Sequence, residues 1–206
     1  MSDLIPINLV VEDELSEAVL REILRQSGRP YEVCACYGRQ GNDYIKQKVN
    51  RWNNAAKGMP YLVLTDLDRC ECAPAKCDHW LPRFKHANLI FRIAVREVES
   101  WVLAHREAFA AFLGVRQSLI PPNPDDLDYP KRELIGIASK SRRRELREAI
   151  VPPERSTAKK GPDYNGRLSE FLQQKWDVQE AVKNSPSLKK AFNAISSFKP
   201  VYGSTG

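Results

Sequence analysis

Four short apolar stretches rich in β-branched residues alternate with stretches of helical periodicity, and this alternation constrains the fold more than any other feature. Residues 7–11, 31–37, 61–65 and 89–95 have the length and composition of strands. Residues 16–26, the stretch through Ile45, Val49 and Trp52, and residues 97–113 carry apolar side chains at helical spacing. The pattern predicts an α/β domain with a mostly parallel central sheet flanked by helices.

The pattern of predicted secondary structure changes after residue 115. A connector rich in proline and aspartate, "SLIPPNPDDLDYPKR", is followed only by helical patterns, at about 132–149, 165–183 and 188–197. We therefore expect an α/β domain at residues 1–115. Residues 116–206 are expected to form a helical C-terminal region packed on that domain.

Positive charge is concentrated in the C-terminal part. The chain carries 32 Lys and Arg against 26 Asp and Glu, a formal net charge of +6. Residues 1–115 hold 15 of each kind, whereas residues 116–206 hold 17 basic and 11 acidic residues. A basic excess of this kind suits a phosphate-backbone partner. No apolar run approaches a membrane helix and the N-terminus lacks secretory features, so we expect a cytoplasmic protein without membrane contact.

Carboxylates follow three of the predicted strands. Glu12 follows the first strand, Asp66 and Asp68 follow the third, and Glu97 and Glu99 follow the fourth. In a parallel sheet the carboxyl ends of the strands share one edge, so these groups are expected to converge. Without a counter-charge they would repel one another and raise each other's pKa. Mg²⁺ or Mn²⁺, which favour oxygen ligands, would remove that cost.

Two assignments within this set stay open. Glu17 lies in the first helical turn, where it is either a metal ligand or a favourable partner of the helix dipole. Glu97 and Glu99 begin a helix two residues apart and so point about 200° from one another. One of them is expected to face the metal and the other a basic residue or solvent. Asp13 and Glu14 are assigned to helix capping or to solvent.

Three segments resemble the motifs of Toprim domains: "VVEDELSEAVLREIL", "LVLTDLD" and "IAVREVESWVLAH". The similarity covers roughly residues 5–113. It is strongest to small stand-alone Toprim-like proteins of the overcoming-lysogenization-defect (OLD) type in anti-phage loci. Asp13 stands where the first motif usually has glycine, and Glu17 lies one residue later than the usual acidic position.

The resemblance implies a Mg²⁺- or Mn²⁺-dependent endonuclease whose catalytic domain is residues 1–115. Glu12, Asp66 and Asp68 match its catalytic carboxylates, and Glu97 or Glu99 matches its third motif. A nucleic acid, with DNA favoured over RNA, would be the substrate. The chain contains no G-x-x-x-x-G-K-[ST] sequence, so a nucleotide-driven step would require an ATPase partner protein.

Basic residues of the C-terminal part are candidates for neutralising charge on the phosphate. Lys159 and Lys160 stand beside "GPDY", and Lys160 is the candidate with a catalytic role. Arg142, Arg143 and Arg144 complete the predicted nucleic-acid-binding set, with a solvated helix face as the alternative.

Three other interpretations compete. A response-regulator receiver would use Asp66 as phosphoacceptor, but it requires a Ser or Thr ending the next strand and a Lys ending a further one. A non-catalytic Toprim-like subunit would bind its partner without cleaving anything. Cys70, Cys72, Cys77 and His79 could form a zinc set, although reduced loop cysteines are the favoured interpretation because this spacing is uncommon.

Overall fold

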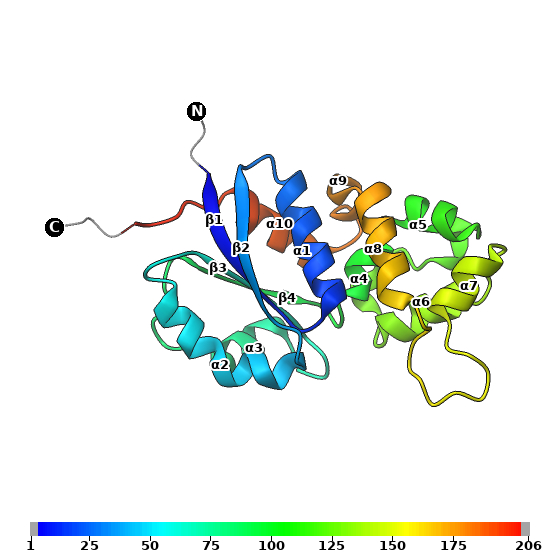
Figure 1. Cartoon of the computed structure of the whole chain (residues 1–206), viewed down its shortest axis with the longest axis horizontal. Coiled ribbons are helices and arrows are strands. Elements are labelled where there is room, and N and C mark those ends of the chain that lie inside the picture. The colour runs from blue at the N-terminus through cyan, green and yellow to red at the C-terminus, as the bar shows by residue number, and fades with distance from the viewer. Residues whose placement is uncertain (1–3, 203–206) are drawn as a thin grey trace. The chain divides into compact units, whose positions relative to one another are not determined.

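The computed structural model describes residues 4–202, and its centre is an all-parallel four-stranded sheet of order β2-β1-β3-β4 (Figure 1). The predicted α/β class with a central parallel sheet, flanking helices and C-terminal helices is confirmed. All four predicted strands are present within one or two residues of their expected ends: β1 (Ile5–Val11), β2 (Tyr31–Gly38), β3 (Tyr61–Asp66) and β4 (Leu89–Ala94). No helix in residues 4–202 has the length and apolarity needed to cross a bilayer.

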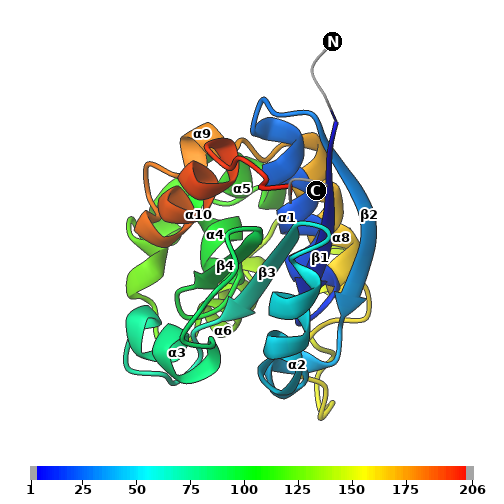
Figure 2. The same cartoon turned by 90° about the vertical axis from the view of Figure 1, so that its left-hand side faces the viewer.

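Helices cover both faces of the sheet. Helix α1 (Glu14–Gln26) lies on one face, and α2 (Gly41–Ala55) and α3 (Ala73–Trp80) lie on the other (Figures 1 and 2). The α2 and α3 face buries an apolar cluster that includes Val10, Val63, Phe91, Val49 and Trp52. Strands buried on both sides explain why β1, β3 and β4 read as nearly continuous apolar runs. Helix α3 is an addition that the sequence pattern does not predict.

The chain divides into two compact units. Among the described residues, the first consists of residues 4–95 and 190–202, and the second of residues 96–189. The predicted boundary at residue 115 lies inside the second unit, just after α5 (Arg106–Leu113). In the first unit, the end of the chain returns to the sheet: the Tyr31 hydroxyl donates to the Ile195 carbonyl at 2.6 Å, and Asn88 pairs with the Val201 backbone.

Helices in the second unit are shorter than the sequence predicts. The expected helix 97–113 is two helices, α4 (Glu99–Ala104) and α5, because the chain leaves helical geometry at His105. The expected helix 132–149 becomes α6 (Pro130–Ala138) and α7 (Arg144–Ile150), and 165–183 becomes α8 (Tyr164–Gln174) and α9 (Val178–Ala181). The predicted helix 188–197 is α10 (Pro186–Ser196).

Aromatic packing and indole hydrogen bonds hold these short helices together. The Phe171 ring of α8 lies 5.1 Å from the Phe109 ring and 5.2 Å from the Phe112 ring of α5, measured between centroids. The Trp176 indole donates to the Trp101 carbonyl at 3.2 Å. Apolar periodicity therefore continues across the breaks in the chain, and this continuity produced the overlong helix predictions.

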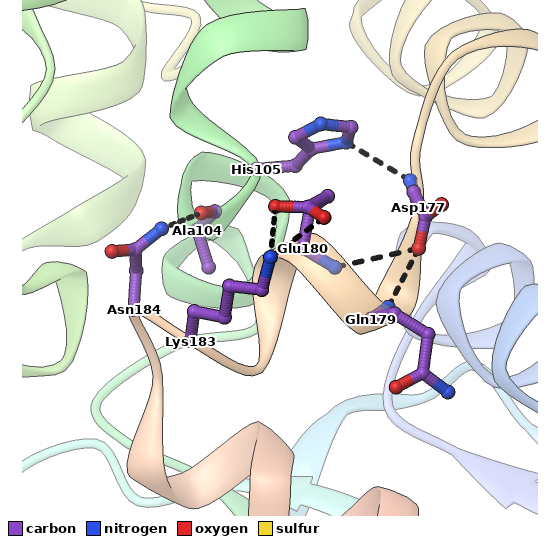
Figure 3. A network of polar contacts seen from close by, with 7 residues as sticks. All are labelled: Ala104, His105, Asp177, Gln179, Glu180, Lys183 and Asn184. Carbon is purple, nitrogen blue, oxygen red and sulfur yellow. Dashed lines mark hydrogen bonds and ion pairs between the residues drawn. The ribbon is translucent and has the colours of Figure 1, made fainter.

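A polar network around His105 fixes α9 to the break between α4 and α5 (Figure 3). His105 Nδ1 accepts a hydrogen bond from the Asp177 backbone N–H at 2.9 Å. The Asp177 carboxylate caps α9 by accepting from two backbone N–H groups, at 2.7 and 3.4 Å. Asn184 donates to the Ala104 carbonyl at 2.9 Å. The contact of His105 requires a neutral imidazole, because only an unprotonated ring nitrogen can accept.

The network predicts a loss of stability in mild acid. Burial lowers the pKa of His105 below its ordinary value of 6.5, although Asp177, Glu180 and Glu107 favour its protonated form, and Lys183 adds to the lowering. A depressed pKa gives stability that is complete above about 6.5 and is lost as the pH falls through the folded-state value. Urea unfolding between pH 7.5 and 5.5 should show this loss in wild type and a smaller one in His105→Gln. Equal pH slopes in the two proteins would contradict the assignment.

The end of β2 passes very close to the end of β1. Gly38 has φ of +100°, and a Cβ on it would lie 2.1 Å from the Val11 carbonyl oxygen. Two backbone hydrogen bonds join the segment after Gly38 to the end of β1 and the residue that follows it. Arg39 N donates to Val11 O at 2.8 Å, and Gly41 N donates to Glu12 O at 3.1 Å. Only glycine fits both the angle and the space.

Gly38→Ala should therefore destabilise the first unit by about 2 kcal/mol or more, because strain at positive φ adds to a backbone clash. Gly28→Ala is the matched control, since Gly28 has φ of +72° but a Cβ on it would meet nothing within 4 Å. Chemical denaturation should show a clearly larger loss for Gly38→Ala. A loss no greater than that of Gly28→Ala would mean that the crossing tolerates a side chain.

Candidate active site

The carboxyl ends of β1 and β3 bring Glu12 and Asp66, two of the predicted site residues, into contact. The strands are hydrogen-bonded neighbours, and Glu12 directly follows β1 while Asp66 ends β3. Glu12 Oε1 accepts from the Asp66 backbone N–H at 2.8 Å and also from the Thr65 hydroxyl. The Glu12 side chain is thus fixed across the strand ends, at the edge where open α/β sheets bind ligands.

The environment of Glu12 opposes its negative charge. Burial is the largest influence and raises the pKa of the Glu12 carboxyl above its ordinary range. The hydrogen bonds from Thr65 and Asp66 and the positive charge of Lys76 act in the opposite direction, whereas the charge of Asp68 raises the pKa further. A buried carboxylate near a second one is typical of a position where a cation binds or a proton is transferred.

A sharp turn after β3 presents Asp68. The Leu67 backbone N–H still bonds to Ala94 O at 2.8 Å, but Asp68 adopts a left-handed conformation with φ of +53°. Asn42 Nδ2, from the first turn of α2, donates to Asp68 Oδ2 at 2.7 Å. The backbone therefore turns out of the strand direction between Asp66 and Asp68, and Asp68 keeps 41% of its side chain exposed.

Lys76 is a site residue that the sequence analysis missed. Its side chain is only 2% exposed, and its Nζ donates to the Asp66 carbonyl and lies 3.7 Å from Asp68 Oδ2. The ammonium also lies over the Trp80 ring, 4.2 Å from its centroid. Lysine is almost never fully buried without such partners. Its ammonium places positive charge close to the Asp68 carboxylate and partly offsets the rise that burial causes in the pKa of Glu12.

The donor chemistry of this edge fits a hard divalent cation. Carboxylate oxygens suit Mg²⁺ and Mn²⁺, and Mg²⁺ commonly uses one or two protein carboxylates, with water and substrate phosphates as its other ligands. With the side chains placed as they are in residues 4–202, no three His, Cys, Asp or Glu residues form a group that could hold a metal ion. The Glu12 and Asp68 carboxylates are the two shown near the charge of Lys76, and a cation bound here would share them with that ammonium.

The cysteine cluster adopts an ordinary structural arrangement. Cys70 and Cys77 pack against the apolar cluster beneath α3, and Cys72 is exposed at the start of this helix. His79 Nδ1 lies 2.9 Å from the Ala75 carbonyl. All five cysteines are free thiols.

Glu17, in the first turn of α1, makes ion pairs with two arginines. Its carboxylate accepts from Arg21 Nε at 2.9 Å and from Arg39 Nε at 2.8 Å. Burial alone would raise the pKa of Glu17, but the hydrogen bonds from Arg39 and Arg21 outweigh it and lower the pKa. These contacts tie α1 to the segment after β2, which favours the structural interpretation of Glu17 over the metal-ligand one.

The third motif lies in the second unit, where Glu97 and Glu99 have different surroundings. Glu99 is fully buried: its Oε1 accepts from the Tyr164 hydroxyl at 2.9 Å and lies 3.2 Å from Lys131 Nζ. Glu97 is half-buried and accepts from the Lys131 backbone N–H at 2.7 Å. Glu97 also lines a cavity of about 270 Å³ together with Tyr129, Lys131, Arg132, Ile135 and Lys159. Of the two glutamates, Glu97 is the one open to a ligand.

The predicted cations are found in several different settings. Lys159 lines the Glu97 cavity from the long loop between α7 and α8, which is drawn in yellow in Figure 1. Lys160 is exposed, and its Nζ lies 3.2 Å from Asn165 Oδ1 and 5.6 Å from the centroid of the Tyr164 ring. Arg144 pairs with Glu148 at 2.7 Å, whereas Arg142 lines a separate cavity at the end of α5. Arg143 is exposed and lies next to Gly114, since a Cβ added to Gly114 would be 3.6 Å from the Arg143 side chain. The structure therefore does not gather the predicted basic set into one cluster.

Comparison with known proteins adds no identification: no protein-family model, curated protein or solved structure matches this chain.

Proposed function

We propose that this protein is a Mg²⁺- or Mn²⁺-dependent nuclease that hydrolyses phosphodiester bonds of nucleic acid, with DNA favoured over RNA. The observation that carries the proposal is the arrangement around the buried Lys76 at the carboxyl edge of the sheet, where the Glu12 and Asp68 carboxylates and the Asp66 backbone lie close to its ammonium. The resemblance of the three motifs to Toprim domains supports the same chemistry. A cytoplasmic location and an ATPase partner in an anti-phage system are part of the proposal.

Each residue of the edge has a separate part in the reaction. Glu12, Asp66 and Asp68 would hold the cation, which when bound polarises the scissile phosphate and lowers the pKa of water. The Thr65 hydroxyl and the Asp66 N–H fix the Glu12 carboxylate, and Asn42 fixes Asp68. Lys76 limits repulsion among the carboxylates and is too deeply buried to contact a polymer itself. Cations of the second unit would neutralise charge on the nucleic acid.

A receiver-like phosphoacceptor shares part of this arrangement, because the strand order 2-1-3-4 also begins the flavodoxin-like sheet of receivers. In residues 4–202, however, β4 leads into Val95 and then Arg96, without a Ser or Thr at its end, and no fifth strand follows it. The lysine that a receiver carries on that further strand has no place here. The nuclease proposal uses Asp68 and Lys76, which the receiver scheme leaves without a role.

The test is a cleavage assay on supercoiled plasmid, single-stranded DNA and single-stranded RNA with Mn²⁺, with Mg²⁺ and with EDTA. It should be run with and without the product of a neighbouring ATPase gene. Cleavage that requires the metal and Asp66 supports the proposal. Absence of cleavage under all conditions, with the protein folded and bound to nucleic acid, would favour the non-catalytic subunit.

A further inference from the structure

The second unit contains a cavity that the proposed chemistry does not use. It has a volume of about 560 Å³ and is lined by Gly114, Val115, Arg116, Leu119, Lys140 and Arg142. Its walls are the end of α5, the 3₁₀ turn η1 (Gln117–Leu119) and the connection between α6 and α7. Among these residues Arg142 belongs to the predicted nucleic-acid-binding set, whereas Arg116 and Lys140 do not.

The charge of this cavity is one-sided. Arg116, Lys140 and Arg142 are exposed, and no acidic residue is among the residues that line it. Within residues 4–202 none of these three side chains has a hydrogen-bond or ion-pair partner. Other cations of the same unit do have acidic partners: Arg144 pairs with Glu148, and Arg167 pairs with Asp163 and Glu170. Three unpaired cationic side chains around one cavity produce a positive potential that attracts an anion.

Both walls of the cavity are held by buried or paired groups. Ser141, which is 2% exposed, donates to the Leu113 carbonyl and accepts from the Arg143 backbone N–H at 3.1 Å, so it fixes the α6–α7 connection to the end of α5. Arg147 donates to the Ser141 carbonyl at 2.7 Å. On the other side, Arg106 donates to the Ile120 carbonyl at 2.9 Å and so secures η1. The backbone positions of the three cations are therefore set before any ligand arrives, which reduces the ordering cost of binding.

We propose that this cavity binds phosphate groups of a nucleic acid strand through Arg116, Lys140 and Arg142. The volume lies within the roughly 300–1,000 Å³ range of ligand pockets and exceeds what a lone phosphate fills. Arginine and lysine together suit consecutive phosphates, since the guanidinium forms paired hydrogen bonds and the ammonium acts as a point charge. The inference rests on the proposed function for the identity of the anion. Two of its three residues, Arg116 and Lys140, are outside the predicted nucleic-acid-binding set.

The test measures binding without cleavage. Fluorescence anisotropy with a labelled single-stranded 20-mer in EDTA would compare wild type with the triple variant Arg116→Gln, Lys140→Gln, Arg142→Gln. We expect the Kd of the triple variant to rise about tenfold or more at low salt. The slope of log affinity against log salt should fall by about 2, because each single-strand phosphate contact contributes roughly 0.7. The matched control carries the same loss of charge at exposed positions that do not line the cavity: Arg51→Gln, Lys57→Gln, Lys175→Gln.

Binding of the cavity variant that is no weaker than binding of the control variant would overturn the proposal. Titration of wild type with AMP and with inorganic phosphate separates a strand from a small anion. If either binds as tightly as the 20-mer and the cavity variant abolishes only that binding, the cavity serves a free anion and the proposal is wrong. Because all arms contain EDTA, a protein that never cleaves nucleic acid can still show the predicted binding loss.

Discussion

Asp66→Asn should reduce metal-dependent cleavage by about 10²–10³-fold while leaving the fold intact, because it removes a charged oxygen and keeps the shape of the side chain. Asp66 N donates to Glu12 Oε1 and Asp66 O accepts from Lys76, and both contacts use backbone atoms that the substitution preserves. The loss should therefore appear in turnover, with nucleic acid binding in EDTA unchanged. Initial rates on plasmid at saturating Mn²⁺ provide the measurement.

Asp43→Asn is the matched control for this substitution. Asp43 is an exposed carboxylate in the first turn of α2, the helix that also supplies Asn42 to the site. The Asp43→Asn variant should cleave plasmid at the wild-type rate. Cleavage by Asp66→Asn that equals cleavage by Asp43→Asn would remove the catalytic role from the sheet edge.

Lys76→Met should destabilise the first unit by about 2 kcal/mol or more. The substitution keeps much of the buried volume but removes the ammonium that donates to the Asp66 carbonyl and that provides positive charge beside the carboxylates of Glu12 and Asp68. We place the loss below the range for a fully buried pair because Asp68 is 41% exposed. Chemical denaturation of the variant provides the measurement.

The same variant should respond more strongly to divalent cations than wild type does. With the ammonium gone, Mg²⁺ would meet less electrostatic opposition and would replace the missing charge, so millimolar Mg²⁺ should raise the Tm of Lys76→Met more than the Tm of wild type. Lys85→Met is the control, since Lys85 Nζ donates to the Leu89 carbonyl at 2.6 Å and makes no ion pair with a carboxylate in residues 4–202. Equal Mg²⁺ responses in the three proteins would show that Lys76 does not act as the counter-charge of a cation site.

Strong local signals explain what the sequence predicts well. Strands buried on both faces leave unbroken apolar runs, so β1, β3 and β4 are recognisable without any alignment. The parallel arrangement then follows from the helices between them, and it explains why Glu12 and Asp66 lie side by side although 54 positions separate them. Asp13 is also as expected, because it caps α1 by accepting from Ser16 N at 2.8 Å.

The features that the sequence does not reveal depend on tertiary contacts. Helix α3 has weak apolar periodicity, so neither it nor the burial of Lys76 leaves a pattern to recognise. The choice between Glu97 and Glu99 depends on Tyr164 and Lys131, which lie 65 and 32 residues from Glu99. The helix breaks at His105 and Asp177 occur because a side-chain cap and a backbone contact replace helical hydrogen bonds, while the apolar spacing continues.

The most direct test of the account is Mn²⁺ binding, measured by electron paramagnetic resonance as the loss of the free-ion signal on addition of protein. We expect wild type to bind Mn²⁺ and Mg²⁺ to displace it. Asp68→Asn and Glu12→Gln should each weaken the binding by at least about tenfold, whereas Asp43→Asn should not. Binding that is identical in all four proteins, or no binding to wild type at millimolar Mn²⁺, would contradict the claim that these carboxylates hold a divalent cation.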